Sequence, residues 1–281
     1  MMPGDGRLRY LLKTSRPRFW LYLAGPVAVG VVYAARDTSD LFTPATLALF
    51  GYFLVPANVL LYGVNDVFDV DVDAENPKKE GREVRYGGDP VVPAAVGLCA
   101  LLALVPAALT PPLAWPWIAG FLALGVAYSA PPLRLKTRPP LDSLSNGLYV
   151  LPGAAAYAAV AGTHPPLLAA AGGWIWSMAM HTFSAIPDID PDRAAGIETT
   201  ATRLGERWTY VYCGAGWTLA AVAFGLLDVR LGLLLGIYPV AVALVATSSI
   251  GVSRAYWWYP AVNTVVGALL TMGGLWRVVH G

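Results

Sequence analysis

Oxygen-bearing side chains gather directly after an uncharged stretch that is long enough to cross a bilayer. The segment 60–77 reads LLYGVNDVFDVDVDAENP. On a helix, Asn65, Asp69 and Asp73 are spaced i, i+4 and i+8 and share one face, whereas the other two aspartates point elsewhere. Such a row suits Mg²⁺, which takes a few carboxylates and completes its octahedron with water and phosphate oxygens. Carboxylates at the end of a membrane segment are costly, so we expect a cation or a functional cavity to offset them.

A second acidic group, IPDIDPDRAAG, closes another uncharged run and places Asp188 and Asp192 four residues apart. We expect the two rows to meet across a cavity, hold Mg²⁺ between them and clamp a diphosphate. The alternative, for either cluster alone, is a solvated acidic loop of a membrane protein. The expected metal ligands, which are also the expected catalytic residues, are Asn65, Asp69, Asp73, Asp188 and Asp192.

Basic residues follow the acidic clusters. Lys78 comes soon after the first cluster, and Arg134 and Lys136 lie in the next polar segment. Cations together with Mg²⁺ stabilise the negative charge that gathers on a departing diphosphate. The alternative is that these residues only set the membrane topology.

The composition is that of a polytopic membrane protein: 56% of residues are hydrophobic and 13% are charged. A membrane span needs roughly 20 apolar residues, so each run of over 40 must fold back once. The Pro-rich segments at 110–112 and 162–166 are the expected turns. We therefore predict nine transmembrane helices. The runs free of Asp, Glu, Lys and Arg are 19–35, 41–65, 90–133, 143–187, 208–227, 231–253 and 255–276.

The basic residues predict an orientation for these helices. With a cytoplasmic N-terminus (1–18), the inner loops 65–90, 131–142 and 187–208 and the turn at Arg254 hold 16 of the 19 Lys and Arg residues. Both acidic clusters then lie on the cytoplasmic side of a cell-membrane protein. No long polar stretch suggests a second domain, so residues 1–281 are expected to form one membrane domain. The net charge of +1 gives no reason to expect a nucleic-acid partner.

Three ordered motifs resemble those of the UbiA superfamily of intramembrane prenyltransferases. NDVFDVDVD resembles the first motif, NxxxDxxxD, and DIDPD resembles the second, DxxxD. The intervening YSAPPLRLK looks like the family's YS-x-P-x-R-x-K stretch. The resemblance implies an all-helical bundle around a central cavity, Mg²⁺-dependent ionisation of an allylic diphosphate, and capture of the carbocation by a lipophilic acceptor from the bilayer. The residues expected to bind the diphosphate are Arg16, Lys78, Tyr128, Arg134 and Lys136.

Within that superfamily, NDVFD with the following NPKK, YSAPPLRLKTRPPLD and DIDPDRAAGIETTATRLG look most similar to the lycopene elongases of C50 carotenoid synthesis. The resemblance implies transfer of a C5 unit from dimethylallyl diphosphate to an end of lycopene. The alternative acceptors are an aromatic quinone precursor or a glycerol lipid.

Aromatic residues near the acidic clusters could stabilise an allylic cation through their π faces, or simply belong to the membrane interface. They are Tyr62, Phe68, Tyr128 and Tyr149. His181 lies two helical turns before Asp188, where it could take up a proton, although packing is the commoner role of a lone intramembrane His.

Two other classes of protein also place acids in a helical bundle: secondary transporters and divalent cation carriers. Transporters carry their coupling carboxylates near the midplane, whereas these clusters lie at helix ends beside basic loops. A cation carrier would explain the aspartates and leave the basic residues unexplained.

Overall fold

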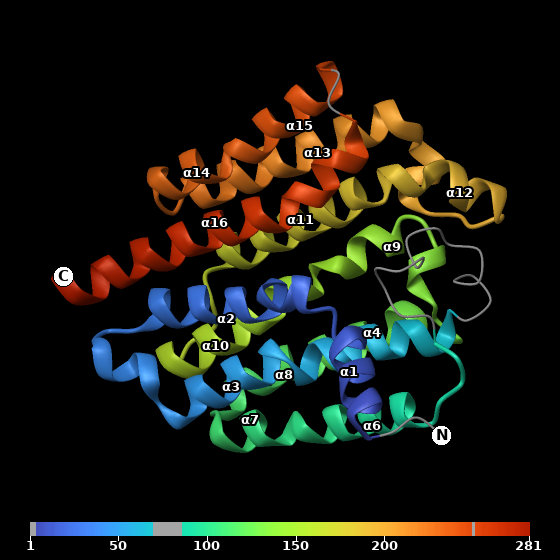
Figure 1. The fold of residues 1–281 in the computed structure, drawn as a ribbon. Coiled ribbons are helices and arrows are strands. Elements are labelled where there is room, and N and C mark those ends of the chain that lie inside the picture. The colour runs from blue at the N-terminus through green and yellow to red at the C-terminus, as the bar shows by residue number, and fades with distance from the viewer. Residues whose placement is uncertain (1–3, 70–85, 249–250) are drawn as a thin grey trace.

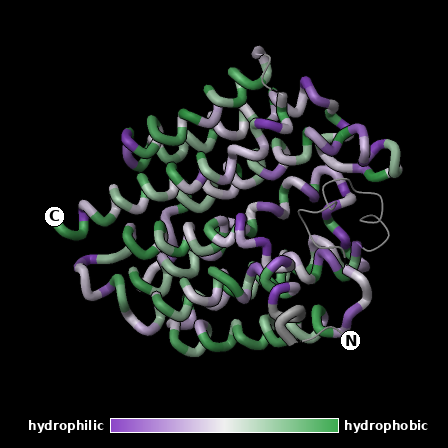
Figure 2. Tube along the Cα trace, in the orientation of Figure 1, coloured by the Kyte–Doolittle hydropathy of each residue, from purple (hydrophilic) through white to green (hydrophobic). Residues whose placement is uncertain are grey.

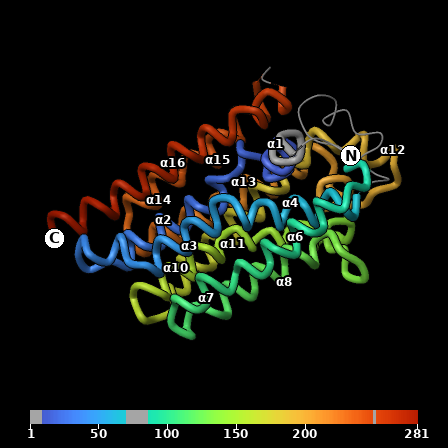
Figure 3. The backbone as a smooth tube through the Cα atoms, turned by 60° about the horizontal axis from the view of Figure 1, so that its bottom comes forward, coloured from blue at the N-terminus to red at the C-terminus, as the bar shows by residue number. Residues whose placement is uncertain are grey.

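The computed structural model describes residues 4–69, 86–248 and 251–281, and these residues form helices and short connections without any strand. The long helices lie side by side in one bundle (Figures 1 and 3). The expected all-α membrane fold is therefore confirmed. Asp73 and Lys78 fall outside the described residues.

Nine rods make up the bundle in the described part of the chain, and several are two helices joined at a kink. In chain order the rods are α2 (Trp20–Ala34); α3 and α4 (Pro44–Leu54, Pro56–Phe68); α6 and α7 (Val91–Leu102, Leu104–Leu109); α8 (Trp115–Ser129); α9 and α10 (Leu141–Leu144, Leu151–Ala161); α11 (Leu167–Ser184); α13 (Thr200–Gly225); α14 and α15 (Val229–Leu235, Ile237–Thr247); and α16 (Val252–His280). Five of these rods are each long and apolar enough, by length and composition, to cross a membrane. The chain is a multi-pass membrane protein.

Proline determines where several rods bend or turn. α3 ends at Leu54 and α4 begins at Pro56, which cannot donate a backbone hydrogen bond to the preceding turn. Asn58 compensates by donating its Nδ2 to the carbonyls of Phe53 and Leu54, at 3.1 and 3.0 Å. The two turns predicted at 110–112 and 162–166 are confirmed, since helices end just before each and begin again just after it.

Polar residues gather at one end of the bundle, beside the N-terminus and near α1 (Gly4–Thr14), α9 and α12 (Ile189–Ala194) (Figure 2). The C-terminal end of α4 lies at this same end (Figures 1 and 3). The segments that carry the two acidic motifs therefore meet the polar end of the bundle.

The bundle contains two main hydrophobic cores. The first is built by α2, α3, α4, α8 and α10, around side chains such as Phe53 and Phe121. The second is built mainly by α11, α13, α15 and α16, around the ring cluster of Phe183, Trp217 and Tyr259. α2 packs against both α10 and α16 and so joins the two halves.

α2 and α10 approach each other unusually closely because glycines lie on both sides of the contact. A Cβ added at Gly153 of α10 would lie 2.7 Å from the carbonyl oxygen of Pro26, and one added at Gly30 of α2 would collide with the Gly153 backbone. Both obstacles are backbone atoms, which cannot move aside as a flexible side chain can. The glycines therefore fix the spacing of the two helices.

We expect Gly30→Ala to destabilise the protein because its new methyl group forces α2 and α10 apart. Overpacking of this kind costs roughly 1–3 kcal/mol. The matched control is Gly25→Ala on the same helix, where an added Cβ meets nothing within 4 Å. Thermal unfolding in detergent should show a lower Tm for Gly30→Ala and an unchanged or higher Tm for Gly25→Ala. Equal Tm values for the two variants would contradict this account of the contact.

Candidate active site

Asp69 is the centre of the candidate site. Its carboxylate is nearly buried, with the whole residue 6% exposed. Oδ2 accepts a hydrogen bond of 2.6 Å from the Asn65 amide, while Oδ1 forms ion pairs with Lys136 and, at 3.4 Å, with Arg134. A buried carboxylate is tolerated only when opposite charges and hydrogen bonds compensate for lost hydration, and this one has both.

α4 ends at Phe68, and this corrects one expectation. The row of Asn65, Asp69 and Asp73 was expected on one helix, but Asp69 has φ −113° and ψ 13° and lies just beyond α4, while Asp73 lies outside the described residues. The physical reason is that β-branched valines and repeated aspartates are poor helix formers, and carboxylates are unfavourable at the negative end of a helix dipole. Arg134 supports this end by donating to the Phe68 carbonyl at 3.4 Å. Asn65 and Asp69, which were expected to share a helix face, are joined by a hydrogen bond at the C-terminal end of α4.

Arg16 lies beside the same motif. Its guanidinium pairs with Asp66 at 3.2 Å and stacks over the Tyr62 ring, 4.6 Å from the centroid. The two aspartates of this motif that the structure describes therefore contact different cations. Asp66 pairs with Arg16, and Asp69 pairs with Arg134 and Lys136. Burial, and then the negative charge of Asp66, raise the pKa of the nearby Tyr10 phenol in α1.

Arg16 and Arg134 share an uncommon backbone conformation. They are the two residues other than glycine with positive φ in the described part of the chain, at 47° and 40°. Left-handed conformations cost energy for such residues and are retained where the surroundings require them. Here both arginines thereby reach the first acidic motif.

The second motif lies on a 3₁₀ helix, η7 (Ile186–Asp188), and on α12. Asp188 and Asp192 are half-buried, while Asp190 is exposed. Figure 1 shows α12 and the C-terminal end of α4 at the same end of the bundle. Among the described residues, which exclude Asp73, no three His, Cys, Asp or Glu side chains form a cluster of metal-ligand size.

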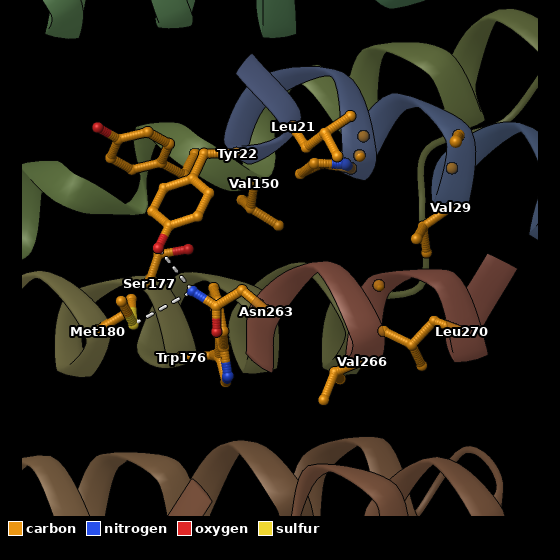
Figure 4. Close-up of a pocket in the computed structure, with 18 of the residues that line it drawn as sticks. Leu21, Tyr22, Val29, Val150, Trp176, Ser177, Met180, Asn263, Val266 and Leu270 are labelled. Atoms are coloured by element: carbon orange, nitrogen blue, oxygen red, sulfur yellow. Dashed lines mark hydrogen bonds between the residues drawn. The ribbon is translucent and has the colours of Figure 1, made fainter. Parts of the chain in front are cut away.

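A large cavity begins at this end of the bundle. It has a volume of about 990 Å³ and extends from Arg16 and Asn65 to Tyr33 and Arg277 near the far ends of α2 and α16. Its wall is mostly apolar and comes mainly from α2, α10, α11 and α16 (Figure 4). A cavity of this shape can hold a long, apolar molecule whose polar end lies near Asp69.

Tyr128 and His181 form a polar pair in the cavity wall. The Tyr128 hydroxyl and His181 Nε2 are 3.0 Å apart, and their rings meet edge to face. The sequence indicated Tyr128, and for His181 it favoured a packing role. The hydrogen bond joins α8 to α11, as expected for a packing histidine satisfied by a neighbour, and the imidazole also lines the cavity.

The aromatic residues expected near the motifs divide into two groups. Tyr62, Tyr128 and Tyr149 line the cavity, whereas Phe68 is 43% exposed and does not. The sequence analysis missed Phe19 and Tyr22, which extend the aromatic wall through ring contacts of 6.0 Å with Tyr62 and 6.3 Å with Tyr149. Phe19 lies just before α2 and Tyr22 lies within it, and their spacing carries no signal beyond that of an ordinary membrane helix.

Asp142 is a further buried carboxylate that the sequence analysis missed. It is 2% exposed and accepts hydrogen bonds from Thr200, at 2.8 Å from the backbone nitrogen and 2.5 Å from the hydroxyl. Asp142 begins the rod of α9 and α10, and Thr200 begins α13 just after the second motif. The contact ties these two segments together.

Comparisons with known proteins agree with this geometry. The model of the UbiA prenyltransferase family matches residues 23–274. A protein of Haloferax volcanii named lycopene elongase/hydratase is 64% identical over 99% of this chain and 92% of its own length, and one of that name from Halobacterium salinarum is 62% identical over 97% and 99%. Among solved structures, a UbiA homolog from Archaeoglobus fulgidus bound to DMAPP and Mg²⁺ has a TM-score of 0.75 at 17% identity, covering 97% of this chain and 100% of that one. The chain therefore belongs to the UbiA prenyltransferase family.

Proposed function

We propose that the protein transfers a C5 prenyl group from dimethylallyl diphosphate to an end of lycopene. The observation that carries this proposal is the position of Asp69, which pairs with two cations and accepts a hydrogen bond from Asn65, a residue that lines the polar end of a long apolar cavity. The relatives named lycopene elongase/hydratase support the choice of acceptor over an aromatic quinone precursor or a glycerol lipid.

The donor atoms at this end suit magnesium. Amide and carboxylate oxygens are ligands that suit Mg²⁺, and Asn65 and Asp69, which are joined by a hydrogen bond from the Asn65 NH₂ group, carry one of each kind. We propose that these two residues, with Asp73, Asp188 and Asp192, hold the metal. When bound, magnesium neutralises charge on the diphosphate oxygens as the allylic carbon–oxygen bond breaks.

The basic residues near the polar end of the cavity are suited to bind the diphosphate. Lys136 and Arg134 already converge on Asp69, and Arg16 lies at the cavity wall. We propose that they bind the diphosphate together with Tyr128 and Lys78, and stabilise the charge on the leaving oxygens.

The cavity wall is suited to stabilise the allylic cation until the acceptor captures it. Tyrosine rings present negative π faces to an allylic cation, and the apolar wall excludes water that would capture it early. The terminal double bond of a polyene is itself the nucleophile, so the acceptor needs no strong base. The length of the cavity, from Asn65 to Arg277, allows a long acceptor to lie along the bundle.

The basic residues also give the bundle an orientation in the membrane. The N-terminus and the inner loops carry most of the Lys and Arg residues, so the polar end of the bundle faces the cytoplasm. A water-soluble diphosphate then enters from the cytoplasm, and the lipophilic acceptor enters from the bilayer. The acidic motifs lie at one end of the bundle rather than at the midplane, which suits an enzyme better than a secondary transporter.

Expression in a lycopene-producing bacterium tests the proposed acceptor. We expect new C45 and C50 carotenoids, because each end of lycopene accepts one C5 unit. Mass analysis of extracted pigments detects them, with cells carrying the empty vector as the control. Unchanged lycopene beside a newly prenylated quinone precursor would assign the protein to aromatic prenyl transfer.

We expect Asp69→Asn and Asp188→Asn each to reduce turnover on the order of 100-fold or more, because each removes a charge from the proposed metal site. The matched control is Asp190→Asn, which neutralises an exposed aspartate of the same segment as Asp188 and should keep near-normal turnover. Release of diphosphate by purified protein with Mg²⁺ is the measurement, and thermal unfolding in detergent reports whether each variant is folded. Normal turnover in a folded Asp69→Asn or Asp188→Asn protein would refute the proposed metal site.

A further inference from the structure

A polar cluster lies inside the mostly apolar cavity. Asn263 of α16 is at its centre, and its Nδ2 donates to the Tyr22 hydroxyl at 3.0 Å and to Met180 Sδ at 3.5 Å (Figure 4). Its Oδ1 accepts from the Tyr238 hydroxyl at 2.8 Å. One amide thus joins α2, α11, α15 and α16, and all four residues line the cavity.

The directions of these hydrogen bonds leave a donor available at Tyr22. The thioether of Met180 can only accept, so the amide NH₂ group faces Met180 and Tyr22. The Tyr22 oxygen therefore accepts from Asn263, and its own hydrogen is bound by no acceptor among the described residues. A hydroxyl hydrogen in an apolar cavity is costly unless a ligand accepts it.

The cluster lies near the polar end of the cavity, where the proposed reaction would form the carbocation. Ser177 of α11 is beside the pair of Tyr22 and Asn263 in Figure 4 and also lines the cavity. His181 follows Ser177 by four residues, so the two share a face of α11 about one turn apart. Since His181 bonds Tyr128 at the polar end, the cluster lies about one turn deeper than that pair.

The chemistry of the cluster identifies its ligand. Phenol, alcohol, amide and thioether groups carry no charge, so nothing here attracts an ion. A free hydroxyl donor next to a second hydroxyl suits a small neutral molecule that both accepts and donates hydrogen bonds. Water meets this description, and buried waters generally occupy such polar positions in protein interiors.

The relatives named lycopene elongase/hydratase point to addition of water after prenyl transfer, and we propose that Tyr22, oriented by Asn263, binds the water molecule that adds to the carbocation. This inference rests on the proposed function. When the prenyl carbon bonds to the acceptor's terminal double bond, the positive charge moves to a tertiary carbon of the acceptor. The water oxygen supplies an electron pair to that carbon and forms the new C–O bond. The oxonium then loses a proton to the imidazole of His181, and the product is a tertiary alcohol. In the absence of this water, the cation loses a proton from an adjacent carbon and gives an alkene.

Oxygen-18 labelling tests the proposal. Purified protein in lipid nanodiscs is supplied with lycopene, dimethylallyl diphosphate and Mg²⁺ in H₂¹⁸O, and the products are separated and analysed by mass spectrometry. Wild-type protein should give elongated carotenoid carrying a labelled hydroxyl group. Tyr22→Phe should lower the ratio of hydroxylated to unhydroxylated elongated product about tenfold, because it removes the hydrogen bond that holds the water.

Tyr259→Phe is the matched control. Tyr259 precedes Asn263 by four residues on α16, is buried, does not line the cavity, and its hydroxyl has no hydrogen-bond partner among the described residues. Loss of the Tyr259 hydroxyl should leave the ratio of hydroxylated to unhydroxylated product unchanged. If Tyr22→Phe inserts poorly, the smaller change Ser177→Ala is measured instead. It should also lower the ratio of hydroxylated to unhydroxylated elongated product.

Three results would overturn the proposal. An unchanged product ratio in folded Tyr22→Phe or, where that variant does not fold, in Ser177→Ala, would assign the cluster to helix packing. Wild-type protein that makes only unhydroxylated elongated carotenoid would reject the water site and leave prenyl transfer intact. Wild-type protein that elongates nothing would reject both.

Discussion

The structure depends on keeping a buried carboxylate charged beside an apolar cavity. The Asp69 side chain has little contact with solvent, and burying an unpaired carboxylate costs several kcal/mol. Asn65, Lys136 and Arg134 offset this cost, and they come from two segments that are far apart in the sequence. The loop that carries the two cations must therefore fold back onto the end of α4, and the unusual backbone of Arg134 is part of that arrangement.

The two hydrophobic cores explain how such a bundle can contain a large cavity. Each half of the chain packs around its own set of side chains, so the space between the halves need not be filled for either half to be stable. α2 contacts both halves, and its close glycine contact with α10 fixes one wall of the cavity. Rigid walls keep the polar groups at their places along the cavity.

Polarity decreases in steps from the Asp69 end of the cavity toward its middle. Charged residues lie at the end near Asp69, the hydrogen-bonded pair of Tyr128 and His181 follows, and the cluster around Asn263 lies about one turn deeper. A diphosphate leaving group needs charged partners, whereas a hydrocarbon cation needs surroundings without water or competing ions. The charged end of the cavity suits the first, and the uncharged groups deeper in the cavity suit the second.

The sequence alone determined the fold class and the composition of the site. Long uncharged runs, Pro-rich turns and one-sided basic loops predict an all-helical membrane bundle, because a bilayer restricts spanning segments to very few forms. Motif spacing also identified Asn65, Asp69, Arg134 and Lys136, which the structure brings together. Only the tertiary structure decided that α4 stops at Phe68, that Asp66 pairs with Arg16, and that His181 and Tyr22 face the cavity. Local periodicity tells which residues share a helix face, but the partner of that face depends on packing between distant helices. Tyr22 and Asn263, 241 positions apart, became neighbours only through that packing.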